Sequence, residues 1–133
     1  MVDELVVREQ LTDGMIRAGE TLTRALDQAK VPINGAFWLY SSESERWTLV
    51  LVSEQVGESG PRKVYGDIQR VLLSLTTKKK LRLSDITVME DTAPLPSALR
   101  NVLEPAMNVR GMRLGGNVVN GQYVEDAYLY FFR

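Results

Sequence analysis

The chain of 133 residues contains no cysteine and no histidine. Histidine is the usual general acid–base and the commonest metal ligand near neutral pH, and cysteine is the thiolate nucleophile, soft-metal ligand and disulfide former. Their absence excludes thiol catalysis, Ser-His-Asp chemistry, zinc fingers and disulfide scaffolds, and haem or iron–sulfur ligation through these residues. What remains is carboxylate–Mg²⁺ chemistry, chemistry of lysine, tyrosine or arginine, or binding alone. We expect no cofactor and no metal site, and the residue types favour a protein that is not an enzyme.

Neither a charge excess nor a long apolar run is present. The 16 basic and 17 acidic residues give a net charge of −1, which argues against a nucleic-acid or membrane-surface binder that works by bulk charge. No apolar run approaches the roughly 18 residues of a transmembrane helix. Residues 1–4 are acidic and lack a signal-peptide layout, so we expect a cytoplasmic protein without a membrane partner. The length and the 44% hydrophobic fraction suit a single globular domain over residues 1–133.

The first segment has the periodicity of a helix. Apolar residues recur at spacings of three and four over residues 7–29, which places them on one stripe. Pro32 ends this helix because it disfavours the helical conformation of the residue before it. Thr12 or Asp13 can serve as an N-cap, so one long helix and two helices broken near residue 13 are both compatible with the pattern.

Strand and helix patterns alternate in the rest of the chain. We expect strands at 36–40 and 47–52, a helix from Pro61, a strand at 83–89 and a short helix capped by Ser97. The first two strands carry apolar residues on both faces, so each face needs a cover from a helix, a loop or a partner chain. Together with a C-terminal hairpin, the order α-β-β-α-β-α-β-β predicts an α+β fold. We expect a mainly antiparallel sheet of about five strands with helices packed on one face.

The C-terminal hairpin is the clearest local signal. Asn120-Gly121 lies between strand-like residues 112–119 and 122–132, and Asn-Gly is the preferred pair for a type I′ turn. A two-residue turn fixes the register, so the residues divide into two faces. The expected core face carries Met112, Leu114, Val118, Tyr123, Ala127, Leu129 and Phe131. The opposite face carries Gly111, Arg113, Gly115, Asn117, Val124, Asp126, Tyr128 and Tyr130.

This opposite face contains the candidate binding residues Arg113, Asp126, Tyr128 and Tyr130. Tyrosine and arginine are enriched at interfaces, and Arg113 and Asp126 are near enough to pair diagonally. The alternative is that the tyrosine rings pack under a helix and the ion pair lies at the rim. The leading hypothesis is a non-catalytic binding or dimerisation module. We expect a homodimer, with a protein partner or a small ligand also compatible with this surface.

One basic run is formed by Lys78, Lys79, Lys80 and Arg82. These side chains are candidate phosphate contacts, although a solvated helix end also explains them. The alternative function is therefore a nucleic-acid-associated protein, including a Mg²⁺-dependent nuclease in which Asp85 and Asp126 converge with a lysine of the run. The glycine-containing residues 57–60 lack the spacing of a phosphate-binding motif and are expected to form a loop.

Overall fold

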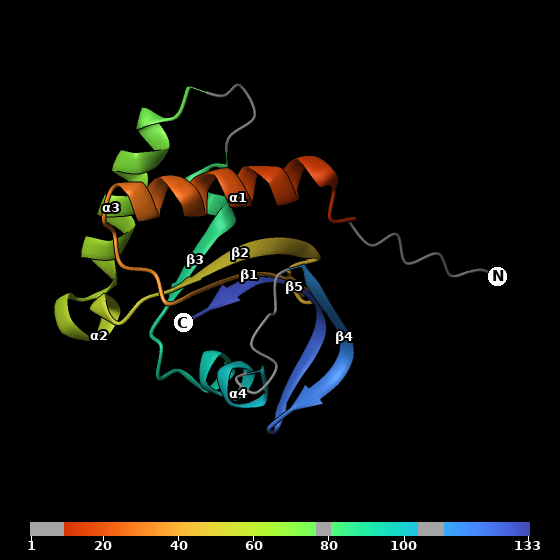
Figure 1. The fold of residues 1–133 in the computed structure, drawn as a ribbon. Coiled ribbons are helices and arrows are strands. Elements are labelled where there is room, and N and C mark those ends of the chain that lie inside the picture. The colour runs from red at the N-terminus through yellow and green to blue at the C-terminus, as the bar shows by residue number, and fades with distance from the viewer. Residues whose placement is uncertain (1–9, 77–80, 104–110) are drawn as a thin grey trace.

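A computed structural model describes residues 10–76, 81–103 and 111–133, with the side chains of residues 102 and 103 left out (Figure 1). Its five strands form one sheet in the order β3-β2-β1-β5-β4. The elements are α1 (Asp13–Gln28), β1 (Gly35–Ser41), β2 (Arg46–Val52), α2 (Gln55–Ser59), α3 (Pro61–Ser74), a 3-10 turn (Leu83–Asp85), β3 (Ile86–Met89), α4 (Pro94–Leu103), β4 (Met112–Val119) and β5 (Gln122–Phe132). Only β2 and β3 pair in parallel, so the expected α+β class and mainly antiparallel sheet are confirmed.

The connections follow from the strand order. Parallel neighbours need a crossover, and α2 and α3 supply it between β2 and β3. The chain then passes from the β3 edge of the sheet to the β4 edge, and α4 lies on this path (Figure 1). No helix among the described residues is long and apolar enough to cross a membrane.

Helices cover both faces of the sheet, which corrects the expectation that they pack on one face. Leu49 and Trp38 belong to the hydrophobic cluster that includes α1 and α3. Phe37 and Val50 belong to a second cluster that includes Leu99 of α4. The physical reason is that β1 and β2 carry apolar residues at consecutive positions. Their apolar side chains therefore point to both faces of the sheet, and both faces are buried. These two apolar faces are covered within the chain and do not require a partner.

The C-terminal hairpin has the predicted register. Val119 lies opposite Gln122, and Asn120 and Gly121 have φ values of 45° and 82°. Positive φ at both central residues is what a type I′ turn requires.

Its two faces differ from the prediction near the tip. Val118 and Tyr123 are 69% and 65% exposed, whereas Val119 and Val124 are buried with the α4 cluster. The strand takes a positive φ of 64° at Gly116, a conformation open to glycine, and the regular alternation is broken there.

A second irregularity lies where β5 pairs with β1. The register shifts between Ala36 and Phe37, which leaves an extra residue in β5. As a result Phe131 packs on the same cluster as Tyr130, on the α1 side, and not on the face of Leu129 as expected.

The first helix, α1, begins at Asp13, and its N-cap is one of the two residues predicted for that position. The Thr12 hydroxyl accepts a hydrogen bond from the Met15 backbone N–H at 3.1 Å, so Thr12 is the N-cap of α1. Residues 7–9 of the expected helical stretch lie outside the described part of the chain.

Three other boundaries move by a few residues. Residues 83–85 form a 3-10 turn, so β3 is shorter than expected. Residues 57–59 end the short helix α2 and are not a loop. The helix α4 begins at Pro94, three residues before Ser97, because proline is tolerated in the first turn, where its missing N–H has no intrahelical acceptor.

Candidate functional site

Arg113 and Asp126 form the predicted diagonal ion pair. Arg113 Nε lies 2.6 Å from Asp126 Oδ1, and Nη2 lies 2.8 Å from Oδ2. The hydrogen bonds to Asp126 raise the pKa of Arg113 against the opposing effect of desolvation. The guanidinium also lies over the Trp47 ring, 5.3 Å from its centroid. This pair is thus a rigid, bidentate contact at an accessible part of the sheet.

The two tyrosines of the predicted binding surface are placed differently. Tyr130 is buried, its hydroxyl accepts a hydrogen bond from Trp38 Nε1 at 2.9 Å, and it donates to the Ile16 carbonyl. Tyr128 is half-buried and meets the Tyr130 ring edge-on, with 5.4 Å between centroids. Tyr130 therefore ties β5 to β1 and α1 inside the chain. A binding role for Arg113, Asp126 and Tyr128 stays a prediction.

A pocket of about 540 Å³ lies on the α1 side of the sheet. It opens between the first turn of α1, the end of the β1–β2 hairpin and the segment around the 3-10 turn. Its lining consists of Met15, Trp38, Ser44, Glu45, Arg46, Trp47, Leu81, Arg82 and Asp85. Both tryptophans of the chain are in this list, and the ring of Trp47 also lies under the Arg113 guanidinium of the Arg113–Asp126 pair.

The charged side chains of this pocket differ in how many protein hydrogen bonds they already make. Arg46 Nη2 is 3.2 Å from Asp85 Oδ1 and 3.2 Å from the Ser84 carbonyl oxygen. Asp85 Oδ2 accepts a hydrogen bond from the Arg82 backbone N–H at 2.9 Å. Both carboxylate oxygens of Asp85 are therefore occupied. The Arg82 side chain is exposed and has no ion-pair partner among the described residues, so its guanidinium is available to a ligand at this pocket.

The nuclease hypothesis requires the strands that carry Asp85 and Asp126 to be neighbours in the sheet. Lys78, Lys79 and Lys80 lie outside the described residues. Asp85 directly precedes β3 and Asp126 lies in β5, and β2 and β1 separate these two strands, so the condition of neighbouring strands is not met. Within the described ranges, no group of three or more acidic side chains could hold a metal ion.

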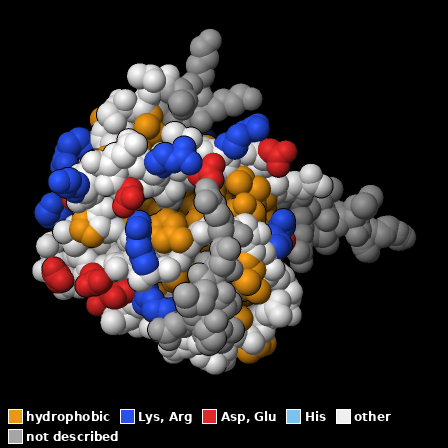
Figure 2. Space-filling model, in the orientation of Figure 1, with side chains coloured by type: hydrophobic (Ala, Val, Ile, Leu, Met, Phe, Trp, Pro, Cys, Tyr) orange, Lys and Arg blue, Asp and Glu red, His pale blue; other side chains and the backbone are white. Residues whose placement is uncertain are grey.

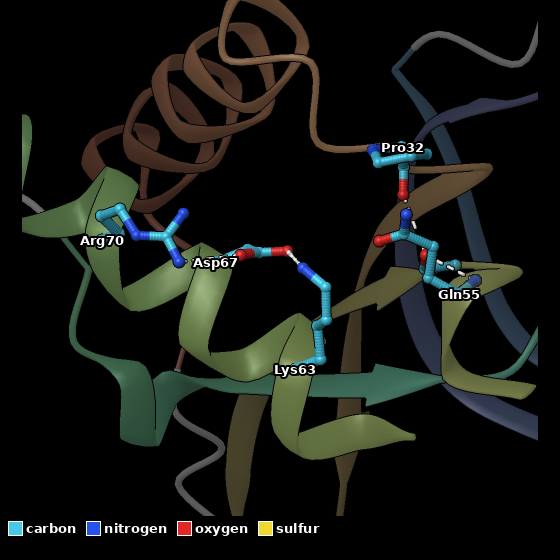
Figure 3. Close-up of polar contacts among 6 residues, drawn as sticks. Pro32, Gln55, Lys63, Asp67 and Arg70 are labelled. Carbon is cyan, nitrogen blue, oxygen red and sulfur yellow. Dashed lines mark hydrogen bonds and ion pairs between the residues drawn. The ribbon is translucent and has the colours of Figure 1, made fainter. Parts of the chain in front are cut away.

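A third group of charges lies on α3 (Figure 3). Lys63 Nζ is 3.2 Å from Asp67 Oδ2, and Arg70 Nη2 is 3.0 Å from Oδ1. Burial of Asp67 opposes its ionisation, but the hydrogen bonds from Lys63 and Arg70 outweigh burial and hold the pKa of the carboxyl below its ordinary 3.8. Figure 3 shows both cations reaching Asp67 from the same helix, with Gln55 on a separate segment beside Pro32. The group stabilises the helix surface and presents no free carboxylate.

Asp67→Asn is expected to lower the free energy of unfolding by about 1 kcal/mol at neutral pH, since the two cations are largely exposed and screened by solvent. A carboxyl with a lowered pKa stabilises the fold above 3.8, and that contribution disappears as the pH falls through and below this value. Urea unfolding from neutral pH downward measures it. The variant should converge on the wild type in acid, and a constant difference at every pH would contradict the assignment.

The view in Figure 2 shows no surface of a single charge sign. Hydrophobic side chains reach this face in small patches between Lys or Arg and Asp or Glu side chains.

No protein-family model, curated protein or solved structure matches the chain.

No pattern in the amino-acid sequence predicts this pocket. Its lining comes from α1, the β1–β2 hairpin and residues 81–85, which are far apart in the sequence. The one signal available was the pair of tryptophans on adjacent strands, and in a sequence these are indistinguishable from core residues.

Proposed function

We propose that this chain is a non-catalytic binding module whose pocket takes a small organic anion with a flat apolar body. The observation that carries the proposal is the pocket with both tryptophans in its lining and, beside them, the Arg82 guanidinium, which has no ion-pair partner in the described part of the chain. A volume of about 540 Å³ is in the range of small-ligand sites, which bury most of a ligand against apolar walls and orient it by a few polar groups.

The chemistry of the lining supports an anion over a cation. A guanidinium offers planar N–H donors that match a carboxylate, sulfonate or phosphate. Arg46 is half-exposed and bound to Asp85 through one nitrogen only, so it can add a second contact. Asp85 is less available to a cationic ligand because both its oxygens already accept protein hydrogen bonds.

The apolar part of the ligand is set by the walls. Met15 contributes partly exposed aliphatic surface, and the edges of the largely buried Leu81 and Trp47 complete an apolar wall against which a planar hydrocarbon body can pack. A binding function also agrees with the absence of histidine and cysteine.

Calorimetric titration with 2-naphthoate, compared with the neutral 2-naphthalenemethanol, tests this proposal. The two probes share a ring system and differ in charge. We expect the anion to bind at least about tenfold more tightly, since a charge-assisted hydrogen bond contributes roughly 1.5–3 kcal/mol. Tryptophan fluorescence gives a second readout, because both tryptophans line the pocket. Equal affinities, or no binding of either probe, would refute the proposal.

Three variants assign the binding to this pocket. Arg82→Ala should weaken 2-naphthoate by about tenfold or more, while Arg62→Ala on the exposed start of α3 should leave it unchanged. Glu45→Gln removes a negative charge from the pocket wall and should strengthen binding roughly twofold. Equal losses in the Arg82 and Arg62 variants would show that general surface charge, and not the pocket, holds the anion.

A further inference from the structure

A second pocket, of about 360 Å³, lies between the last turns of α3 and the segment that leads into the 3-10 turn. Its described lining consists of Gln69, Leu72, Leu73, Leu81, Arg82, Leu83 and Ser84. Most of these side chains are leucines, and none of them is aromatic or acidic. The pocket is therefore suited to an aliphatic group, whereas the first pocket contains both tryptophans of the chain.

The two pockets share Leu81 and Arg82. Both residues belong to the lining of each pocket, so the pockets are adjacent and meet at this dipeptide. Leu81 is 9% exposed and packs in the same core cluster as Leu72, which fixes the segment against α3. The Arg82 side chain is exposed and forms no ion pair within the ranges that the structure describes. An anionic group bound by Arg82 is therefore next to both pockets at once.

The charge of the second pocket also favours an anion. Arg82 is the one charged side chain in its described lining. The first pocket, by contrast, includes the carboxylates Glu45 and Asp85 besides its arginines. A ligand carboxylate at Arg82 thus meets no carboxylate from the described lining on the α3 side. A guanidinium binds such a planar anion through two parallel N–H donors.

The lining of the second pocket also includes an exposed leucine. Leu73 is 69% exposed and is one of three large hydrophobic side chains exposed among the described residues. The preceding residue, Leu72, is 4% exposed, so the lining passes from a buried leucine to an exposed one. An aliphatic chain in this pocket would remove part of the apolar surface of Leu73 from water, which is favourable.

We infer that the ligand is an amphiphilic anion that spans both pockets. Arg82 binds its anionic group, the first pocket takes its flat part, and the second pocket takes an aliphatic chain. The inference rests on the proposed function and adds the chain to the ligand. N-acylated aromatic amino acids have this layout, because the carbon that carries the carboxylate also carries the aromatic side chain and the acylated nitrogen.

Calorimetric titration of the full chain with N-acetyl-, N-hexanoyl- and N-octanoyl-phenylalanine tests the inference, with 2-naphthoate as the probe of the first pocket alone. The three acyl probes share the carboxylate and the ring and differ only in chain length. We expect about twofold tighter binding per added methylene. Full burial would give about fourfold, but the exposed Leu73 leaves one side of the chain in water. N-octanoyl-phenylalanine should also displace 2-naphthoate, since both need Arg82.

Two serine substitutions assign the chain to the second pocket. Leu73→Ser should weaken N-octanoyl-phenylalanine by about threefold or more and leave 2-naphthoate unchanged. Val118→Ser is the control, because Val118 is also 69% exposed but lies in the C-terminal hairpin, outside both linings. This control should bind every probe as the wild type does. Circular dichroism checks that each variant is folded.

The outcomes separate this inference from the proposed function. Binding of 2-naphthoate with no dependence on chain length would overturn the inference and leave the proposed function intact. A chain-length gain that Leu73→Ser leaves unchanged, or simultaneous binding of 2-naphthoate and N-octanoyl-phenylalanine, would also overturn it. A gain that depends on Leu73 without any binding of 2-naphthoate would refute the proposed function and, with it, a ligand that spans both pockets.

Discussion

Replacing Gly19 with alanine should destabilise the protein by about 2–3 kcal/mol, although glycine-to-alanine changes inside exposed helices stabilise by about 1 kcal/mol. Gly19 is buried in the middle of α1. A Cβ added there would overlap the Tyr130 hydroxyl and lie 3.1 Å from Trp38 Nε1. Relief of this overlap requires Tyr130 to move, which breaks its hydrogen bonds to Trp38 and Ile16. The free energy gained from the higher helix propensity of alanine is smaller than the free energy lost through the steric overlap and the broken hydrogen bonds.

Urea unfolding measures this effect, and Gly66→Ala is the matched control. Gly66 is also inside a helix, α3, but it is exposed and an added Cβ meets no atom within 4 Å. The control should be stabilised by roughly 0.5–1 kcal/mol. Stabilisation of both variants would mean that the close approach of α1 to Tyr130 is absent in solution.

Tyr130→Phe is the second change with a large expected effect, a loss of about 2–3 kcal/mol in the free energy of unfolding. The ring stays, so the packing of the core is retained and only the hydroxyl is removed. The indole N–H of Trp38 and the carbonyl of Ile16 each lose their hydrogen bond to this hydroxyl. The buried indole N–H left without an acceptor costs about 1–3 kcal/mol, and the Ile16 carbonyl loses the bond that it accepts in addition to its helical one. Tyr123→Phe is the control, since its side chain is 65% exposed and the change should cost less than about 0.5 kcal/mol.

The same hydroxyl makes stability depend on pH in the alkaline range. Burial raises the pKa of Tyr130 well above its ordinary 10.0, more than the hydrogen bond from Trp38 lowers it. An acid whose pKa is raised in the folded state contributes stability that is present below the unfolded value and is lost as the pH rises above it. Between about pH 9 and pH 11 the wild type should therefore lose stability faster than Tyr130→Phe. Parallel pH profiles would contradict a buried hydroxyl at this position.

The local features of the fold were predictable because they depend on neighbours in the chain. Asn120 and Gly121 are suited to positive φ, and this sets the hairpin register without any help from the rest of the molecule. The hydroxyl of Thr12 starts α1 for the same reason, since the N–H that it accepts is three residues away. The apolar runs of β1 and β2 likewise implied that both faces of the sheet need a cover.

The candidate site was predictable only in part. Arg113 and Asp126 follow from the hairpin register and form the expected ion pair. The position of Tyr130 could not be foreseen, because a half-buried tyrosine at an interface and a tyrosine under a helix have the same alternation in sequence. In the structure α1 packs closely on Tyr130 at Gly19, so this tyrosine lies under a helix and not at an exposed surface.

The sequence by itself determined the α+β class, the strand pairing at the C-terminus and the exclusion of thiol and histidine chemistry. These properties depend on residue types and on contacts close in the chain. The tertiary structure alone decided that α4 covers the face opposite α1, that Gly116 and the β5 bulge change which side chains are buried, and that β3 and β4 are the outer strands of the described sheet. It also brought Met15, Trp47 and Arg82 to one pocket. Such contacts join distant segments, and their positions depend on how the layers pack, which no local pattern encodes.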